Sequence, residues 1–324
     1  MCFLYAAEAL APISYYFVTT QDDVDSSIEN EISFEGVSES MKVLVPEHPL
    51  APNSLRIEPK KDVKKFTDWN DINIQETHVL IQRIVDVWQK MGITDYLIYG
   101  KESDDSKSAF GWEIVPYRHN EWRFWRFWNQ LKVLWNISFG SLSTDKTGMN
   151  KVITDFEKNR KKFIQASYPQ NLSIRGNDAF CNQKIIEKQR VFEGRTVNIL
   201  YNYAPIGKEK LHFLIVPKEH HVKFSDLTME EYEETMKLSQ KLINFYKSKG
   251  IKTVYLFDKS GTEAGQTVPH WHEHVVFTAT KTQEFIGKLT ILKNMLIGSS
   301  SLSDDKLKKQ VEYLKNELRP VLSD

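Results

Sequence analysis

The sequence predicts an α+β protein made of two copies of one unit, each a mainly antiparallel sheet with helices on one face. Short motifs recur along the 324-residue chain at a nearly constant separation, which indicates a tandem duplication. In each copy, segments rich in β-branched and aromatic residues surround one long segment with helical periodicity. With a single long helix per copy, most neighbouring strands must be joined by hairpins, which favours antiparallel pairing.

The duplication has a period of 158 residues. Phe34-Glu35-Gly36 recurs as Phe192-Glu193-Gly194, 158 positions later, and chance matches would not keep one separation over most of a chain. We therefore expect two units, at residues 1–158 and 159–324. The other matches at this separation are Pro59-Lys60 with Pro217-Lys218, Phe66 with Phe224, and Gly92-Ile93 with Gly250-Ile251.

The second unit shows its predicted elements most clearly. Its helix is expected to open at Ser225 or Asp226, both good N-cap residues, and to end near Gly250. The helix stripe expected in the core is Leu227, Tyr232, Met236, Leu242, Ile243 and Tyr246. The predicted strands are residues 196–203, 212–216, 253–257 and 270–278, and the first unit is expected to have a helix at 71–89 and a strand at 96–99.

Composition excludes several classes of protein. Lys and Arg together number 43, as do Asp and Glu, so the formal net charge is zero and no interaction with nucleic acid is predicted. No run of 18 or more apolar residues occurs, so no transmembrane segment is expected. The only cysteines, Cys2 and Cys181, form no disulfide framework, which predicts a reducing, cytoplasmic location.

Three histidines alternate along the last predicted strand. Because side chains two residues apart project from the same face of a strand, His270, His272 and His274 should form a row, with Trp271 and Glu273 on the other face. The spacing alone leaves three readings open: a solvated polar face, a transition-metal site, or a nucleophilic imidazole acting on phosphorus.

The loop before these histidines favours phosphate chemistry. Residues 261–268 contain two glycines, so the backbone can present N–H groups to phosphate oxygens near Gly265. Gln266 and Thr267 would add side-chain donors. The prediction is therefore nucleophilic catalysis, with no metal ligand and no cofactor.

Loop and histidines together resemble the signature of the histidine-triad (HIT) superfamily: Gly-Gln-Ser/Thr-Val running into His-x-His-x-His and two apolar residues. The resemblance extends upstream, where His212 opens an apolar run that ends at Pro217-Lys218, and covers roughly residues 190–280. It implies attack by His272 on the α-phosphate of a nucleotide and a nucleotidyl-histidine intermediate. It implies catalytic roles for His272, His270, His274 and Gln266, and substrate-binding roles for Asn202, His212, Gly265 and Thr267.

The resemblance leaves the type of reaction open. Family members that transfer a nucleotidyl group usually carry Gln at the third histidine position, so His274 favours hydrolysis of a nucleoside polyphosphate, phosphoester or phosphoramidate. The tandem layout instead resembles the galactose-1-phosphate uridylyltransferase and dinucleoside polyphosphate phosphorylase branch. A third reading is a nucleotide-binding module that acts through a protein partner.

The first unit lacks the triad. No histidine occurs between His78 and His119, and Ser54 stands in the place of His212. Because histidine-triad units commonly pair across a two-fold axis, the resemblance implies an intramolecular pseudo-dimer with one active and one inactive unit. One position departs from the family, since Glu273 would be buried unless a basic residue meets it or that face is less covered.

The first unit also contains an aromatic stretch, with Trp122, Trp125 and Trp128 close to Arg123 and Arg126. Two readings compete. The favoured one is a helix packed between the two units with its arginines reaching outward. The other is an exposed surface for a protein partner, a base or a membrane.

Overall fold

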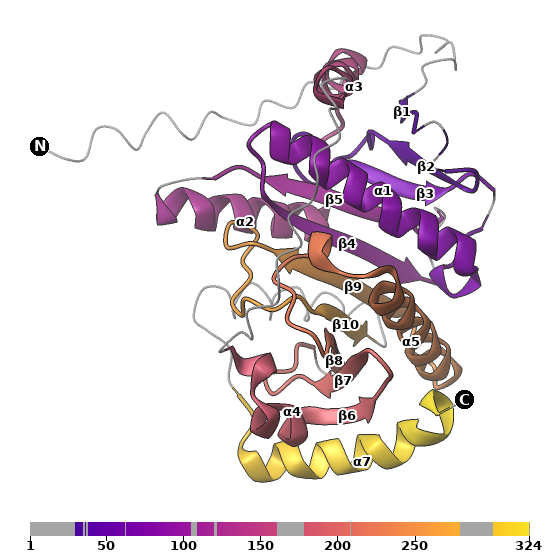
Figure 1. The fold of residues 1–324 in the computed structure, drawn as a ribbon, viewed down its shortest axis with the longest axis vertical. Coiled ribbons are helices and arrows are strands. Elements are labelled where there is room, and N and C mark those ends of the chain that lie inside the picture. The colour runs from indigo at the N-terminus through magenta and orange to yellow at the C-terminus, as the bar shows by residue number, and fades with distance from the viewer. Residues whose placement is uncertain are drawn as a thin grey trace, which may run out of the picture.

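The computed structural model describes residues 30–323, apart from residues 35, 37, 62, 105–108, 120–121, 161–177, 208 and 279–300. Its centre is a single antiparallel sheet in the order β1-β2-β3-β5-β4-β9-β10-β8-β7-β6 (Figure 1). The strands are β1 (Glu31–Ile32), β2 (Met41–Leu44), β3 (Leu55–Pro59), β4 (Asp95–Ser103), β5 (Trp112–Tyr117), β6 (Arg190–Glu193), β7 (Val197–Tyr201), β8 (His212–Pro217), β9 (Thr253–Ser260) and β10 (Glu273–Thr278).

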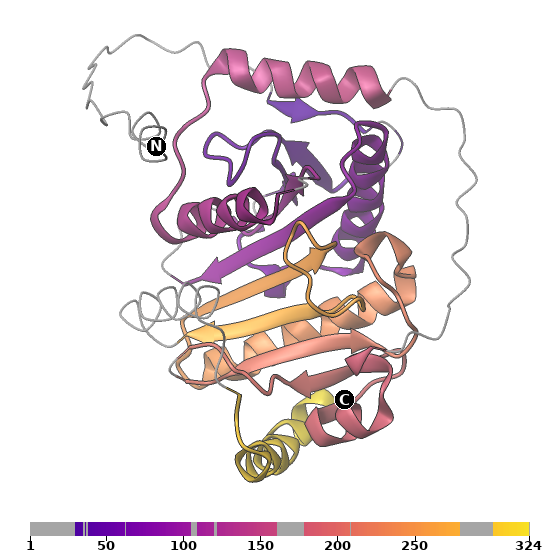
Figure 2. The ribbon, with the colours of Figure 1, turned by 90° about the vertical axis from the view of Figure 1, so that its left-hand side faces the viewer.

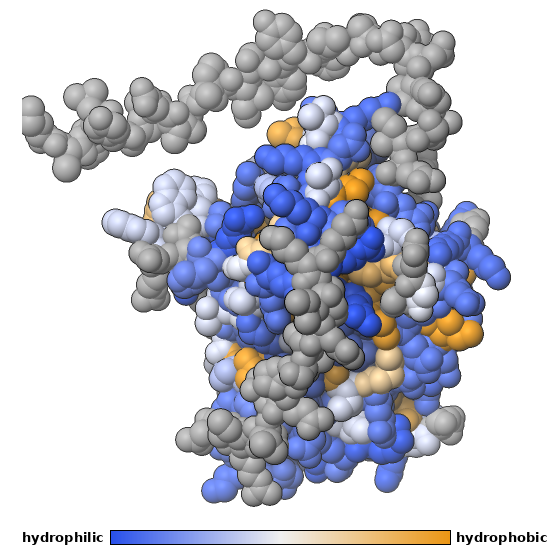
Figure 3. Space-filling model, turned by 45° about the horizontal axis from the view of Figure 1, so that its top comes forward, coloured by the Kyte–Doolittle hydropathy of each residue, from blue (hydrophilic) through white to orange (hydrophobic). Residues whose placement is uncertain are grey.

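Helices cover the two faces of this sheet unequally. The long helices α1 and α5 lie side by side on one face, behind the strands in Figure 2, whereas α2 lies on the face toward the viewer. The surface seen in Figure 3 is largely hydrophilic, with small separate hydrophobic patches. The helices are α1 (Asp71–Lys90), α2 (Arg123–Phe139), α3 (Lys146–Arg160), α4 (Gln183–Gln189), α5 (Met229–Ser248) and α7 (Asp304–Leu322), with 3-10 turns η1 (Phe66–Asp68), η2 (Ala179–Cys181) and η3 (Phe224–Asp226).

The predicted duplication is confirmed in the order and spacing of the elements. The pair η1 and α1 recurs as η3 and α5, with every boundary shifted by 158 residues. The last strands, β5 and β10, begin at Trp112 and Glu273, a shift of 161, because the preceding loop is three residues shorter in the first unit. The α+β class with two antiparallel units is therefore correct, while the division at residue 158, inside α3, stays a prediction.

The two units pair across an approximate two-fold axis. β4 and β9 run antiparallel, with Tyr99 opposite Phe257, its own equivalent 158 positions later. On the helix face, Gln75 donates a hydrogen bond to Glu233, again its equivalent, at 2.6 Å. Because each element meets its own copy, the sheet continues from one unit into the other and forms the expected intramolecular pseudo-dimer.

Helix α5 begins later than predicted. Ser225 and Asp226 belong to the 3-10 turn η3, and the N-cap is Thr228. Thr228 and Glu231 form a reciprocal capping box, which satisfies two backbone N–H groups and outweighs the single cap that Ser225 or Asp226 could provide. The predicted end is correct, since Gly250 follows the helix with a φ of +88°.

The apolar stripe predicted for α5 is buried against the sheet. Glu273, the position that departs from the family pattern, lies in the same core. Its side chain is 1% exposed and accepts a hydrogen bond from the Ser239 hydroxyl at 2.7 Å. Both alternatives considered for Glu273 are therefore wrong, because the face is fully covered and the described contacts include no basic partner. Burial, chiefly, raises the pKa of Glu273 to about 8, so the carboxyl is neutral at pH 7.

None of the helices in the described ranges combines the length and apolar character needed to cross a lipid bilayer.

The second face of the sheet has smaller apolar clusters of its own. Beneath α2, Val133 packs with Leu97 and Val115, and beneath α4, Ile186 packs with Leu200 and Leu214. Between these clusters lies the part of the sheet that carries the histidines.

Candidate active site

A row of imidazoles crosses the sheet on the face opposite α5. His274 on β10 lies between His212 on β8 and His272, with ring centroids 5.1 and 4.8 Å away. The predicted strand at 270–278 begins only at Glu273, so His270 and His272 belong to the segment that enters it. Their shared orientation therefore comes from that segment and its contacts as well as from strand alternation.

The hydrogen bonds of His212 set the tautomer of His274. The backbone N–H of Ile206 donates to Nδ1 of His212 at 3.3 Å, and the side-chain amide nitrogen of Asn202 lies 3.2 Å from Nδ1 and 3.3 Å from Nε2 of the same ring. The proton of His212 is then on Nε2, which lies 2.9 Å from Nδ1 of His274. His274 therefore carries its own proton on Nε2 and can donate it to a ligand on this face.

Nε2 of His272 is a hydrogen-bond acceptor, whereas Nε2 of His274 is a donor. Nδ1 of His272 lies 2.8 Å from the carbonyl oxygen of His270, so Nδ1 carries the proton and donates it. Nε2 is left with a free lone pair. The ring is 8% exposed, which leaves a small accessible area on an otherwise enclosed side chain.

All of these imidazoles are neutral at physiological pH. Burial lowers the pKa of His272 to about 4 and that of His212 to about 3, and it places the pKa of His274 well below the usual value. Neighbouring imidazoles reinforce the shift, because a second positive charge would be unfavourable there. A neutral imidazole is the form that can act as a nucleophile.

Three further side chains on this face were not identified from the sequence. The ring of Phe257 stacks on His274 at 4.4 Å, and Phe180 meets His272 edge-on at 5.0 Å. Lys259 follows Phe257 by two residues on β9 and therefore shares its face; its positive charge helps lower the pKa of both His272 and His274. The available signal was a lysine at an alternate strand position just before Gly261.

The glycine loop is held in place from within. Gln266 accepts a hydrogen bond from the Gly261 N–H at 2.7 Å and donates one to the Val222 carbonyl at 2.8 Å, so its amide braces the loop. Gly261 has a φ of +93°, and a Cβ there would overlap the Asp95 carboxylate at 2.1 Å. Thr267 is exposed at the end of the loop, where its hydroxyl is accessible.

Residues of the first unit also bind the glycine loop, through hydrogen bonds and an ion pair. Asp95, at the start of β4, accepts a hydrogen bond from the Glu263 N–H at 2.9 Å. From α2, Arg126 binds both carboxylate oxygens of the buried Glu263, at 2.9 and 3.0 Å, and Gln130 donates to the Glu263 carbonyl at 2.8 Å. Gly265 lies against Gln130, where a Cβ would come within 3.3 Å of the amide. The first unit therefore shapes the loop of the histidine-bearing unit.

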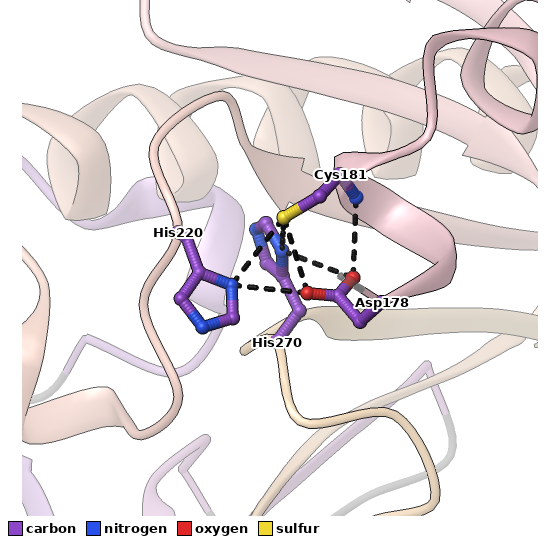
Figure 4. Close-up of side chains that lie close together, drawn as sticks. All are labelled: Asp178, Cys181, His220 and His270. Carbon is purple, nitrogen blue, oxygen red and sulfur yellow. Dashed lines mark hydrogen bonds and ion pairs between the residues drawn. The ribbon is translucent and has the colours of Figure 1, made fainter. Parts of the chain in front are cut away.

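His270 lies in a second cluster of metal-ligating side chains (Figure 4). Asp178, Cys181, His220 and His270 each offer one ligand atom, and these atoms all lie within 4.8 Å of one another. Oδ2 of Asp178 lies 3.0 Å from Nδ1 of His220, and Sγ of Cys181 lies 3.4 and 3.6 Å from Nδ1 of His220 and of His270. About 3.3 to 3.8 Å separates neighbouring ligands around a tetrahedral zinc ion, so this mixed O/S/N₂ set, with atoms up to 4.8 Å apart, would hold Zn²⁺ after its side chains move slightly closer.

The sequence did not predict these ligands, and it assigned His270 to the triad alone. Asp178 and Cys181 come from η2, 39 or more residues before the two histidines in the chain, and only the fold brings them together. A bound metal would fix the three segments that supply the ligands and would stabilise the position of Phe180 between Asp178 and Cys181. His220 lies between helices and strands, in a loop segment, and is half-buried in this cluster.

In the first unit, different residues occupy the positions that correspond to His272 and His274. Strand register puts Glu113 in the position of His274, since Glu113 pairs with Tyr99 just as His274 pairs with Phe257. Glu113 accepts a hydrogen bond from the Leu50 N–H, and burial raises its pKa to about 7. Gly111 stands in the place of His272, with the Arg56 guanidinium 2.9 Å from where a Cβ would lie.

Two α+β units thus share one sheet, and the second of them carries the row of histidines. Comparison with known families agrees: the HIT domain model matches residues 183–281. The match lies within the second unit, which therefore contains a HIT domain.

The similar proteins cover parts of the chain to different extents. Bis(5'-adenosyl)-triphosphatase of Saccharomyces cerevisiae is 35% identical over 97 residues, which is 28% of this chain and 45% of that protein. An uncharacterized HIT-like protein of Methanocaldococcus jannaschii is 30% identical over 86 residues, 26% of this chain and 65% of that one. The first of these matches therefore spans less than half of the relative.

Among solved structures, a GalT-like protein of Arabidopsis thaliana is similar over 84% of this chain and 83% of its own, with a TM-score of 0.50 and 12% identity. At this identity the likeness concerns the fold alone. It extends over both units, whereas the HIT domain model matches residues 183–281.

Proposed function

We propose that the chain is a nucleotide hydrolase that acts at the α-phosphate of a nucleoside polyphosphate, phosphoester or phosphoramidate. The observation that carries the proposal is the free lone pair on Nε2 of His272. The His270 carbonyl holds the proton on Nδ1, and the ring is neutral and only slightly exposed. Such an imidazole is prepared for attack without any prior loss of a proton.

In the first step, Nε2 of His272 forms a bond to the α-phosphorus, and the bond from phosphorus to the leaving group breaks with its electron pair. The Nε2–H of His274 donates to a phosphate oxygen or to the departing atom. The Lys259 ammonium offsets the negative charge that collects on the phosphate oxygens. The product of this step is a nucleotidyl-histidine and a free leaving group.

In the second step, water attacks the same phosphorus from the side that the leaving group vacated. The bond between phosphorus and Nε2 breaks, its electron pair returns to His272, and the water proton passes to His274, where that residue gave up its own proton in the first step, or to solvent. Thr267 and the backbone N–H groups near Gly265 would hold phosphate oxygens, and Asn202 is proposed to reach the ribose. The internal bonds of Gln266 favour a bracing role for it over direct contact with phosphate.

Nucleotidyl transfer to a phosphorylated acceptor is the second candidate. The shared sheet favours it, because two units joined in this way resemble the transferase and phosphorylase branch of the superfamily. A histidine at the third position favours hydrolysis, since its Nε2–H can exchange protons with water. The two candidates differ only in whether water or an acceptor phosphate attacks the intermediate.

Adenosine dinucleotides and adenosine phosphoramidates labelled at the α-phosphate test the proposal. We expect release of labelled mononucleotide and, after rapid quenching in base, a labelled protein adduct that is lost in acid. His272→Ala should lose turnover, whereas His48→Ala, which changes an exposed histidine of the first unit, should keep it. Product formation only on addition of phosphate or a sugar phosphate would favour transfer, and full turnover by His272→Ala would exclude both candidates.

A further inference from the structure

Helix α2 and the residues that flank it carry most of the large apolar side chains exposed in the described part of the chain. The helix contacts both units, as predicted, but not through its tryptophans: the side chains of Trp125, Trp128 and Trp135 are 46–56% exposed. Outside this region, the large apolar side chains exposed among the described residues are Ile72, Tyr203 and Tyr313. Those on or next to α2 are Trp122, Phe124, Trp125, Trp128, Trp135, Phe139 and Leu142.

Four of these side chains form one stripe along the helix, and Trp125 borders it in ring contact with Phe124. Phe124, Trp128, Trp135 and Phe139 follow one another at intervals of four, seven and four residues, which places them on one face of α2. Neighbouring rings touch, with centroids 5.9 Å apart for Phe124 and Trp128 and 4.4 Å apart for Trp135 and Phe139. The helix therefore presents an aromatic ridge of about 22 Å, from Phe124 to Phe139.

The opposite face of α2 fixes the ridge in its outward orientation. Val133 is buried against the sheet, and Gln130 and Asn136 donate to the carbonyls of Glu263 and Leu50, both at 2.8 Å. In Figure 1 the helix stands out from the left side of the sheet, at the edge of the molecule. The ridge is thus a convex and well-supported feature of the surface.

Exposed basic side chains lie near the ridge. Residues 122–144 contain two arginines and Lys132 but no Asp or Glu, although Arg126 is paired with the buried Glu263 and acidic residues stand at positions 121 and 145. Lys132 is exposed on α2, and Arg118 is exposed shortly before it. The local surface is therefore cationic as well as aromatic.

We propose that this ridge docks on an anionic lipid bilayer. Tryptophan prefers the bilayer interface, where its ring lies among the acyl chains and its N–H reaches the headgroups. Exposed Lys and Arg beside such rings add attraction to anionic lipids. A second copy of this chain is a poorer occupant, because a two-fold contact would place one cationic ridge against another.

Vesicle co-sedimentation of the full chain tests this proposal. We expect binding to vesicles of phosphatidylcholine mixed with phosphatidylserine, weaker binding to phosphatidylcholine alone, and a blue shift of tryptophan emission on binding. Added salt should weaken binding. The triple variant Trp125→Ala, Trp128→Ala, Trp135→Ala should lower the partition coefficient by at least about tenfold, and Lys132→Glu should lower it for the anionic vesicles only.

The matched control is Ile72→Ala with Tyr313→Ala, which removes exposed apolar side chains elsewhere and should bind like the wild type. All of these positions are exposed, so the variants should keep the wild-type circular dichroism spectrum. Failure of the wild type to bind, or unchanged binding by the triple variant, would overturn the proposal. A dimer in light scattering that the triple variant dissociates would assign the ridge to a second copy instead.

Discussion

Replacing Glu273 by Gln should make the protein more stable, and increasingly so as the pH rises. Glu273 is almost fully buried between α5 and the sheet, and its pKa is raised from 4.5 to about 8, mainly by burial, with the nearby Asp258 adding to the effect. Across the sheet it lies opposite Asp258, and its hydrogen-bond donor is the Ser239 hydroxyl. Gln keeps the size and can accept the same hydrogen bond, but it cannot ionise.

The sign of the change in stability with pH follows from the direction of the pKa shift of Glu273, which is upward. Below about pH 4.5 the carboxyl is protonated in both states, so it contributes no pH dependence. Between pH 4.5 and about 8 the unfolded chain releases the proton and the folded chain retains it, so stability falls by about 1.4 kcal/mol per pH unit. Above pH 8 the loss is complete, at about 5 kcal/mol.

Urea unfolding at intervals from pH 5 to pH 8 measures this effect. The free energy of unfolding of Glu273→Gln minus that of the wild type should grow by about 3 kcal/mol between pH 5 and pH 7.5. Asp258 is present in both proteins, so most of its own contribution cancels. Glu312→Gln, at an exposed position of α7, is the control and should leave the difference flat. Parallel curves for Glu273→Gln and wild type would refute the reasoning.

Three other predictions follow from the site. Arg126→Ala leaves the buried carboxylate of Glu263 short of its main partner and should cost about 3 kcal/mol in urea unfolding, together with weaker nucleotide binding by calorimetry; equal affinity would contradict the loop-holding role. Lys259→Met should weaken nucleotide binding about tenfold while keeping or raising the melting temperature, and unchanged affinity would remove Lys259 from the phosphate site. Zinc in excess over a chelated sample should raise the melting temperature by about 5 °C, and Cys181→Ser with His220→Ala should abolish that shift; a wild-type melting temperature indifferent to zinc would contradict the metal site.

Much of the fold could be predicted because its signals are local or repeated. The helix stripe of α5 and the strand at residues 253–257 are periodic patterns within one segment, and the duplication is a comparison of the chain with itself. The start of α5 was predicted wrongly because several nearby residues can serve as its N-cap. Ser225, Asp226 and Thr228 can each cap a helix, and the reciprocal bond between Thr228 and Glu231 decided among them.

The features of the candidate site also differ in whether they could be predicted from one contiguous segment. Residues 261–276 revealed the glycine loop and the alternating histidines, because those are contiguous. Lys259 was overlooked because a single lysine on a strand has no distinctive local pattern. The proton positions on His272 and His274 also lay beyond the sequence, since each depends on a hydrogen-bond partner supplied by another segment.

The sequence by itself determined the duplicated α+β plan, the loss of histidines from the first unit and the row of imidazoles in the second. Tertiary structure alone decided which distant groups meet: Arg126 with Glu263, Asp178 and Cys181 with His220 and His270, and Glu273 with Ser239. It also decided that the tryptophans of α2 face outward. Helical periodicity defines the faces of a helix, but the contacts made by the rest of the chain determine which face is covered.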